Sequence, residues 1–220
     1  MITLPDFAKA FDYENNFYLS SDVTRLSKVL AHYELFKMIE DIPGAIIECG
    51  VLKGCSLVRF ASFRELFGHS FVKKIVGFDS FGSFPETNFE PDKKLRERHI
   101  KMCGEESISK EQLTEILKHK GIDKNLELIE GDILQTVPQY VKAHPELKIS
   151  LLNLDVDIYE PSKVILDELF PRVVKGGVII FDDYGTFPGE TKAIDEYFED
   201  KKYKIHKLSF CMTPSYLVKE

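Results

Sequence analysis

The sequence contains no tryptophan, only four cysteines and no C-x-x-C pair. The cysteines therefore predict no disulfide framework, and reduced thiols indicate a cytoplasmic protein. No apolar run approaches the ~18 residues that a membrane span needs. The first residues include early acids and no long apolar segment, so we expect neither a signal peptide nor a membrane span.

Positive charge is also scarce, since 29 Lys and Arg stand against 36 Asp and Glu, a formal net charge of −7. An acidic surface repels polyanions, so we expect neither nucleic acid nor an anionic membrane as a partner. The length of 220 residues fits a single domain over 1–220 with a well-buried core. No internal repeat or linker indicates a second domain. The sequence leaves open whether the protein forms a homo-oligomer.

Apolar runs of strand length alternate with helical patterns along the chain. Strands are predicted at 45–51, 74–78, 126–130, within 149–159 and at 178–183, and helices at 23–40, 56–67, 109–121, 161–174 and 191–198. Two short strands at 203–210 and 215–219 are close enough to form a hairpin. The pattern predicts an α/β fold: a doubly wound, Rossmann-like, mostly parallel seven-stranded sheet with a C-terminal antiparallel hairpin.

Residues 1–44 are predicted to form an N-terminal arm followed by a helix. The first 20 residues are aromatic and polar without a clear period. Ser21 or Asp22 is expected to cap the helix. Its predicted buried stripe consists of Leu26, Val29, Leu30, Tyr33 and Phe36.

Residues 80–122 form a segment too long for a βα connection, which usually takes ~2–6 residues. Long ordered insertions often act as lids or binding loops, so we expect this one to cover the acceptor as a mobile lid. Ser109 and Gln112 predict a capping box at the start of its helix, which Gly121 ends. His99 is the one histidine that we expect to contact a substrate.

The glycine turn after the first strand is the opening of a nucleotide-binding βα unit. Gly50 and Gly54 are spaced G-x-x-x-G, and Leu52 takes the place of the middle glycine of a dinucleotide fingerprint. This spacing favours a ligand without phosphates, although such turns also serve only to pack a helix on its strand. Glu48 would repel a pyrophosphate but can hold an amino group.

Carboxylates also follow the next two strands. Asp79 has the position from which a carboxylate binds ribose hydroxyls, and Asp132 can accept from an adenine amino group. Each alone is equally well a solvated turn or loop acid. Because they join Glu48 and Gly50 at the carboxyl ends of successive strands, the set predicts S-adenosylmethionine (SAM) as the ligand.

Four further aspartates end two apolar runs: Asp155, Asp157, Asp182 and Asp183. Acids after strands often only cap helices or face water. Four unpaired carboxylates in one cleft would raise one another's pKa, and a divalent cation removes that conflict. Hard Mg²⁺ or Ca²⁺ favours oxygen ligands, and no His/Cys cluster indicates zinc.

Five blocks of the sequence resemble one known family: IIECGVLKGCS, VGFDSFGSFP, IEGD, LLNLDVDIYEPSK and GGVIIFDDYGTFPGETKAIDEYF. They are similar to the macrocin-type O-methyltransferases, which are class I, SAM-dependent and divalent-metal-dependent enzymes. The resemblance covers about residues 45–198. It implies Asp155, Asp182 and Asp183 as metal ligands and Asp157 as general base. It implies a SAM site lined by Glu48, Gly50, Gly54, Ser56, Asp79, Ser80, Gly131 and Asp132.

The resulting hypothesis is a SAM-dependent O-methyltransferase that methylates a hydroxyl of a sugar or sugar-bearing metabolite, such as a glycoside or nucleotide sugar. Mg²⁺ or another divalent cation would orient the acceptor, and Asp157 would take its proton. Two alternatives stay open. One is a catechol-type enzyme acting on an aromatic diol, which Phe81, Phe84 and Phe89 would suit. The other is a non-catalytic SAM-binding protein.

Overall fold

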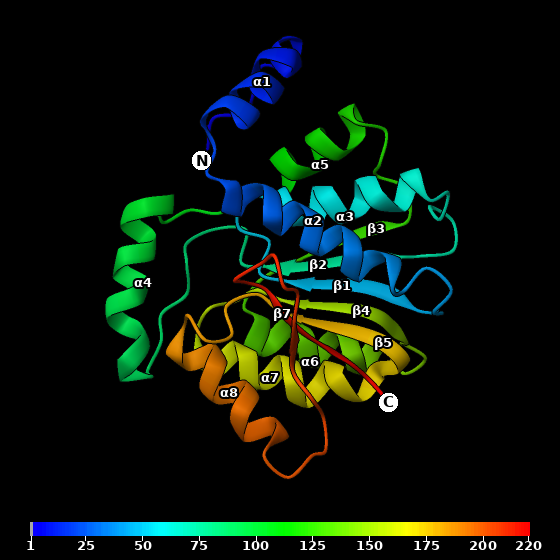
Figure 1. Ribbon diagram of the computed structural model, residues 1–220, viewed down its shortest axis with the longest axis vertical. Coiled ribbons are helices and arrows are strands. Elements are labelled where there is room, and N and C mark those ends of the chain that lie inside the picture. Colours follow the sequence, from blue (N-terminus) through cyan, green and yellow to red (C-terminus); the bar gives the residue numbers. More distant parts are fainter. Residues whose placement is uncertain (1) are drawn as a thin grey trace.

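The computed structural model describes residues 2–220 and contains one mixed sheet (Figure 1). Its strands are β1 (Ala45–Cys49), β2 (Ile75–Asp79), β3 (Leu126–Glu130), β4 (Ile149–Leu154), β5 (Val173–Phe181), β6 (His206–Lys207) and β7 (Ser215–Val218). Their order is β3-β2-β1-β4-β5-β7-β6. The first five are parallel, and β7 runs antiparallel to β5 and β6. The predicted doubly wound sheet with a terminal hairpin is confirmed.

Helices cover both faces of the sheet. They are α1 (Ala10–Ser20), α2 (Val23–Lys37), α3 (Cys55–Leu66), α4 (Glu90–Cys103), α5 (Lys110–His119), α6 (Ile133–Ala143), α7 (Tyr159–Leu169) and α8 (Pro188–Phe198). Figure 1 shows α2, α3 and α5 on one face and α6, α7 and α8 on the other. Alternate strand residues such as Ile46 and Ile47 enter separate apolar clusters on the two faces. Within residues 2–220, no helix is long and apolar enough to cross a membrane.

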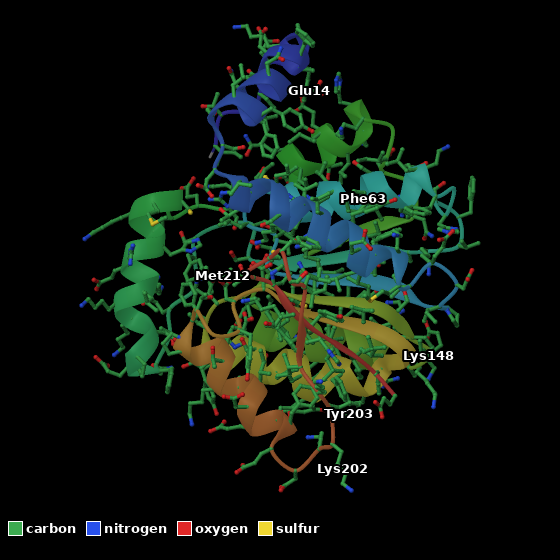
Figure 2. All side chains as sticks on the ribbon, viewed as in Figure 1. Glu14, Phe63, Lys148, Lys202, Tyr203 and Met212 are labelled. Atoms are coloured by element: carbon green, nitrogen blue, oxygen red, sulfur yellow. The ribbon has the colours of Figure 1, made fainter. Side chains whose placement is uncertain are left out.

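The N-terminal arm is helical, and the stripe predicted for the helix after it was partly wrong. Helix α1 buries no residue, and Figure 2 shows its Glu14 at the outer tip of the molecule, far from Phe63 of α3. Asp22 caps α2 by accepting from Thr24 N. The buried face of α2 consists of Ala31, His32, Leu35 and Phe36, whereas Leu30 is exposed. The prediction counted only apolar residues and so missed the buried His32.

Strand β5 starts five residues earlier than predicted. The sequence pattern placed a helix to Val174 and a stop at Gly176-Gly177. Helix α7 instead ends at Leu169, because a short 3-10 turn over Phe170–Arg172 contains a proline. The two glycines lie inside β5, where the pairing with β4 shifts register between Ile149 and Leu151. Glycine marks an irregularity in this strand rather than its start.

The insertion 80–122 contains two helices instead of the one predicted. Its charged piece forms α4, which has Pro91 in the first turn and Glu90 and Asp92 beside the positive end of the helix dipole. Gly104 ends it with a positive φ of 82°. The predicted capping box of Ser109 and Gln112 at the start of α5 is confirmed. In Figure 1, α4 stands at the side of the sheet rather than over either face.

Arg64 of α3 is fully buried at the amino ends of β2 and β3. Its guanidinium donates to the carbonyl oxygens of Lys73, just before β2, and Asn125, directly before β3. It also donates to the carbonyl oxygens of Ile122 and Lys124. The contacts with Lys73 and Ile122 are buried, so removing the guanidinium takes a donor away from two buried carbonyls and from two partly buried ones.

We expect Arg64→Leu to lower the free energy of unfolding by roughly 2–4 kcal/mol, because unsatisfied buried polar groups are costly. Chemical denaturation measures the change. Arg98→Leu on the exposed surface of α4 is the matched control and should change stability little. Equal stability of both variants would show that Arg64 does not fasten this edge.

Candidate active site

The predicted site residues gather at the carboxyl ends of the parallel strands. The turn after β1 packs directly on the segment after β4. Gly50 has a φ of 91°, and a Cβ built on it would lie 1.6 Å from the carbonyl oxygen of Asp155. Asp155 N donates to Cys49 O at 3.0 Å. Only glycine fits at position 50, so the glycine turn and the first aspartate of the acidic group are held against each other.

Asp79 organises the glycine turn from the end of β2. Its Oδ2 accepts from Val51 N at 2.7 Å and Leu52 N at 2.9 Å. Its Oδ1 accepts from Phe81 N at 2.7 Å and Ser107 Oγ at 2.8 Å. The carboxylate therefore joins the turn to the insertion. Its predicted bond to ribose stays a prediction, and in this structure its oxygens accept from these four donors and, at 3.4 Å, from Ser80 Oγ.

Glu48 and Asn153 are fully buried on neighbouring strands and lie opposite each other in the register. Ser56 Oγ donates to Glu48 Oε1. Among the described residues, Glu48 Oε2 and both polar side-chain atoms of Asn153 have no hydrogen-bond partner. Burial raises the pKa of Glu48 to about 8. Buried polar atoms are rarely left unpaired, so this spot suits polar groups of a ligand or ordered water.

The other residues predicted for SAM have local roles as well. Gly54 is the N-cap residue of α3 with a φ of 80°, and Gly131 N donates to Asp79 O at 2.9 Å. Ser80 Oγ donates to Ser83 O at 3.1 Å. Asp132 is exposed and caps α6 by accepting from Leu134 N at 2.9 Å. Its predicted contact with adenine stays a prediction.

The structure brings together the three predicted metal ligands. One carboxylate oxygen from each of Asp155, Asp182 and Asp183 lies within 4.8 Å of the others. Asp157 lies beside Asp183 and has a φ of 64°, which is rare for a residue other than glycine. Glu190 N holds this conformation by donating to Asp157 O at 3.3 Å. Strained backbone of this kind is concentrated at functional sites.

The aspartates differ in how their surroundings affect ionisation. Burial, followed by repulsion from the other acids, raises the pKa values of Asp155, Asp157 and Asp183. Burial would also raise the pKa of Asp182, but attraction to Lys28 and contact with His32 outweigh it and lower that pKa to about 2. Asp182 is therefore the one member of the group that its protein neighbours keep fully ionised.

Lys28 of α2 supplies the compensating charge and was not predicted. Its Nζ lies 2.5 Å from Asp182 Oδ2. Burial lowers the pKa of Lys28, but Asp155 and Asp182 raise it by more. The sequence held one signal, since Lys28 precedes His32 by four residues and so extends the buried face of α2.

His32 has a single tautomer in this site. Arg59 NH1 lies 3.0 Å from His32 Nδ1, and because a guanidinium only donates, Nδ1 must accept. The imidazole is then neutral with its proton on Nε2, which points toward Asp182 Oδ1 at 3.9 Å. Burial lowers the pKa of His32, which also favours the neutral form. Sequence reasoning assigned neither residue, since nothing local connects α2 with α3.

Glu190 is a fifth carboxylate at this edge and also was not predicted. It is fully buried in the first turn of α8. Its Oε1 accepts from Asp183 N at 2.9 Å, whereas Oε2 has no hydrogen-bond partner within residues 2–220. Glu190 therefore contacts the backbone of both Asp157 and Asp183.

Known structures share this fold. The structure of CalS11, described as a calicheamicin methyltransferase, matches with a TM-score of 0.76 at 26% identity, covering 97% of this chain and 86% of that one. The structure of the O-methyltransferase NovP matches with a TM-score of 0.75 at 20% identity, covering 87% and 79%. The fold and the glycine turn thus define a protein of the class I methyltransferase type.

The family model described as Macrocin-O-methyltransferase (TylF) matches residues 23–209, and the chain belongs to this family. The 8-demethyl-8-(2,3-dimethoxy-alpha-L-rhamnosyl)-tetracenomycin-C 4'-O-methyltransferase of Streptomyces olivaceus is 26% identical over 149 residues, 67% of this chain and 55% of the relative. The demethyldecarbamoylnovobiocin O-methyltransferase of Streptomyces niveus is 28% identical over 166 residues, 71% and 59%. The chain thus spans less than two thirds of either relative. The family's members are O-methyltransferases, which use SAM, so the family resemblance of the sequence is confirmed.

We expect Lys28→Met to destabilise the metal-free protein by roughly 1–3 kcal/mol at pH 7, because it leaves the buried Asp182 carboxylate without its partner. The pKa of Asp182 is lowered from 3.8 to about 2, so the pair stabilises the fold above about pH 4. That contribution is lost as the pH falls through about 2. Denaturation at several pH values should therefore show the difference between the two proteins shrinking in acid.

Lys37→Met is the control for this prediction, because Lys37 lies on the same helix in an exposed pair with Glu34. It should change stability little at any pH. A Lys28→Met protein as stable as the wild type at pH 7 would contradict the charge compensation described above.

Proposed function

We propose that the protein is a SAM-dependent O-methyltransferase that methylates a hydroxyl of a sugar or sugar-bearing metabolite. The observation that carries the proposal is the group of three carboxylates packed against the glycine turn through Gly50 and Asp155. Relatives support the acceptor class: one is described as acting on a rhamnosyl-tetracenomycin, and CalS11 is described as a TDP-rhamnose 3'-O-methyltransferase.

The residues present fit a divalent cation. The donors of Asp155, Asp182 and Asp183 are all carboxylate oxygens, the ligand type that Mg²⁺ and Ca²⁺ prefer. Asp182 Oδ1 is buried and has no hydrogen-bond partner in the described part of the chain, so it has an unused acceptor site. We propose these three residues as the ligands. When bound, the cation would lower the pKa of the acceptor hydroxyl and fix its orientation.

Asp157 is the proposed general base. It lies beside Asp183, is almost completely buried, and burial raises its pKa. A carboxylate with a raised pKa is a better proton acceptor near neutral pH than an exposed one. Asp157 would take the hydroxyl proton while the acceptor oxygen bonds to the methyl carbon of SAM and the carbon–sulfur bond breaks, which leaves S-adenosylhomocysteine. Glu190 holds the backbone of Asp157 in place, and Lys28 keeps Asp182 ionised.

Substitution of Asp79 tests the proposed SAM site. Asp79→Asn keeps the size of the side chain but replaces one acceptor oxygen by an NH₂ group, which opposes the N–H donors of the glycine turn. We expect the affinity for S-adenosylhomocysteine, measured by calorimetry, to fall roughly tenfold to a hundredfold. Asp123→Asn, in an exposed loop, should bind as the wild type does. Unchanged affinity of a folded Asp79→Asn protein would remove Asp79 from the site.

Substitution of a proposed metal ligand and substitution of the proposed base should have different effects on binding and activity. Asp182→Asn should lower the affinity for Mg²⁺, and excess Mg²⁺ should restore part of the activity, because mass action offsets a weakened binding site. Asp157→Asn should leave the binding of Mg²⁺ and SAM nearly intact but slow methyl transfer by ~10²–10⁴-fold, the usual share of a general base. Calorimetric titration and single-turnover assays distinguish the two defects.

EDTA provides the control for this experiment, because it should abolish wild-type turnover while SAM stays bound. Full activity in EDTA would refute the metal proposal. Rescue of Asp157→Asn by Mg²⁺ would mean that ligands and base are assigned wrongly.

The aromatic side chains of the insertion favour a second candidate for the acceptor, an aromatic diol. Phe84 stacks on His99 with ring centroids 5.3 Å apart, and Phe89 lies 5.2 Å from Tyr159. A panel of nucleotide sugars, glycosides and catechols separates the two acceptor classes by the compound that is methylated. Turnover of none of them, with SAM bound, would favour the non-catalytic alternative.

A further inference from the structure

Asp92 of α4 connects the insertion to two other helices. Its side chain is fully buried. Oδ2 accepts from Tyr159 N at 3.0 Å, and Oδ1 accepts from Gly189 N at 2.7 Å. Tyr159 begins α7 and Gly189 is the second residue of α8. Neither helix has a cap from its own N-cap side chain. One carboxylate from a distant segment therefore caps both helices.

The backbone of α8 is shaped for this contact. A Cβ built on Gly189 would lie 1.9 Å from Asp92 Oδ2 and 2.5 Å from Tyr159 N. Any side chain at position 189 would therefore push the carboxylate out of its place between the two helices. Gly189 has an ordinary backbone conformation, so space, not φ, is the reason for glycine here.

A second set of contacts fastens the same part of the insertion. Glu160 of α7 accepts from Thr87 Oγ1 at 2.9 Å and from Asn88 N at 2.8 Å. Glu160 lies in the first turn of α7, and Thr87 and Asn88 lie just before Phe89, the N-cap residue of α4. The start of α4 is therefore attached through polar contacts at both Asp92 and Glu160, although α4 covers no face of the sheet.

The segments that lead into the two capped helices carry the residues of the proposed chemistry. Tyr159 follows the proposed base Asp157 by two residues. Gly189 precedes Glu190, which accepts from Asp183 N and donates to Asp157 O. On the side of the insertion, His99 of α4 lies 6.2 Å from Phe187 between ring centroids, and its Nε2 is buried with no hydrogen-bond partner among the described residues. Asp92 thus connects helix α4, which contains His99, to the loops that contain Asp157 and Asp183.

We propose that Asp92 is a positioning residue for the acceptor. By capping α7 and α8, it holds α4 in a fixed place beside the site where the acceptor would bind. This inference rests on the proposed O-methyltransferase function. It differs from the mobile lid expected from the sequence, because Asp92 and Glu160 fasten the start of α4 to α7 and α8.

Asp92→Asn tests the proposal with little change in shape. The amide keeps one acceptor oxygen and turns an NH₂ group toward the other N–H donor, so one cap is lost. With TDP-rhamnose as the probe acceptor, we expect the KM for this acceptor to rise roughly tenfold or more. The Kd of S-adenosylhomocysteine should stay unchanged. Gly189→Ala, which displaces the carboxylate by a different route, should have the same effect. Glu97→Gln, at an exposed position of α4, is the control.

Hydrogen exchange is the second readout and needs no turnover. Peptides covering α4 and the starts of α7 and α8 should exchange faster in Asp92→Asn than in the wild type or Glu97→Gln. If no acceptor is methylated by the wild type, the proposed function fails, and this readout still decides whether Asp92 fastens α4. Unchanged exchange would overturn the proposal. So would faster exchange with an unchanged KM for the acceptor, which would make the contact purely structural.

Discussion

Compensation of buried negative charge is the constraint on which this site depends. A group of five buried or partly buried carboxylates follows β4 and β5: Asp155, Asp157, Asp182, Asp183 and Glu190. Burial together with mutual repulsion raises the pKa of every member except Asp182. Lys28 is the cation in direct contact with the group. Because Lys28 comes from α2, this helix is part of the site and not only a cover for the sheet. A bound divalent cation would complete the compensation that a single ammonium group leaves partial.

A series of packing contacts and hydrogen bonds connects the proposed SAM site with the proposed acceptor site. Gly50 brings the glycine turn against Asp155, and Asp79 joins that turn to the insertion through Ser107. Asp92 then joins the insertion to the two helices that follow the aspartates. A rigid arrangement of this kind suits a reaction in which positioning of the reacting groups supplies much of the rate.

The sequence predicted the parts of the site that follow from strand ends. Asp155, Asp182 and Asp183 end apolar runs, and in a parallel sheet such ends meet at one edge. Lys28 and Asp92 could not be predicted in this way, because their partners lie more than 60 residues away and no local pattern connects them. The start of β5 was missed because Gly176-Gly177 is a usual stop signal, whereas here it lies within the strand. The helix α4 was missed because it has no apolar stripe; its end signals, Pro91 and Gly104, were present.

Arg64 lies at the opposite edge of the sheet from the carboxylates, where the strands begin. The groups that fasten this edge are therefore separate from those that would perform chemistry. Mutations that change which acceptors an enzyme uses often lower its stability, because new side chains at an active site tend to be destabilising. In this fold, the loops around Arg64 offer a place to restore that stability while leaving the reacting groups untouched.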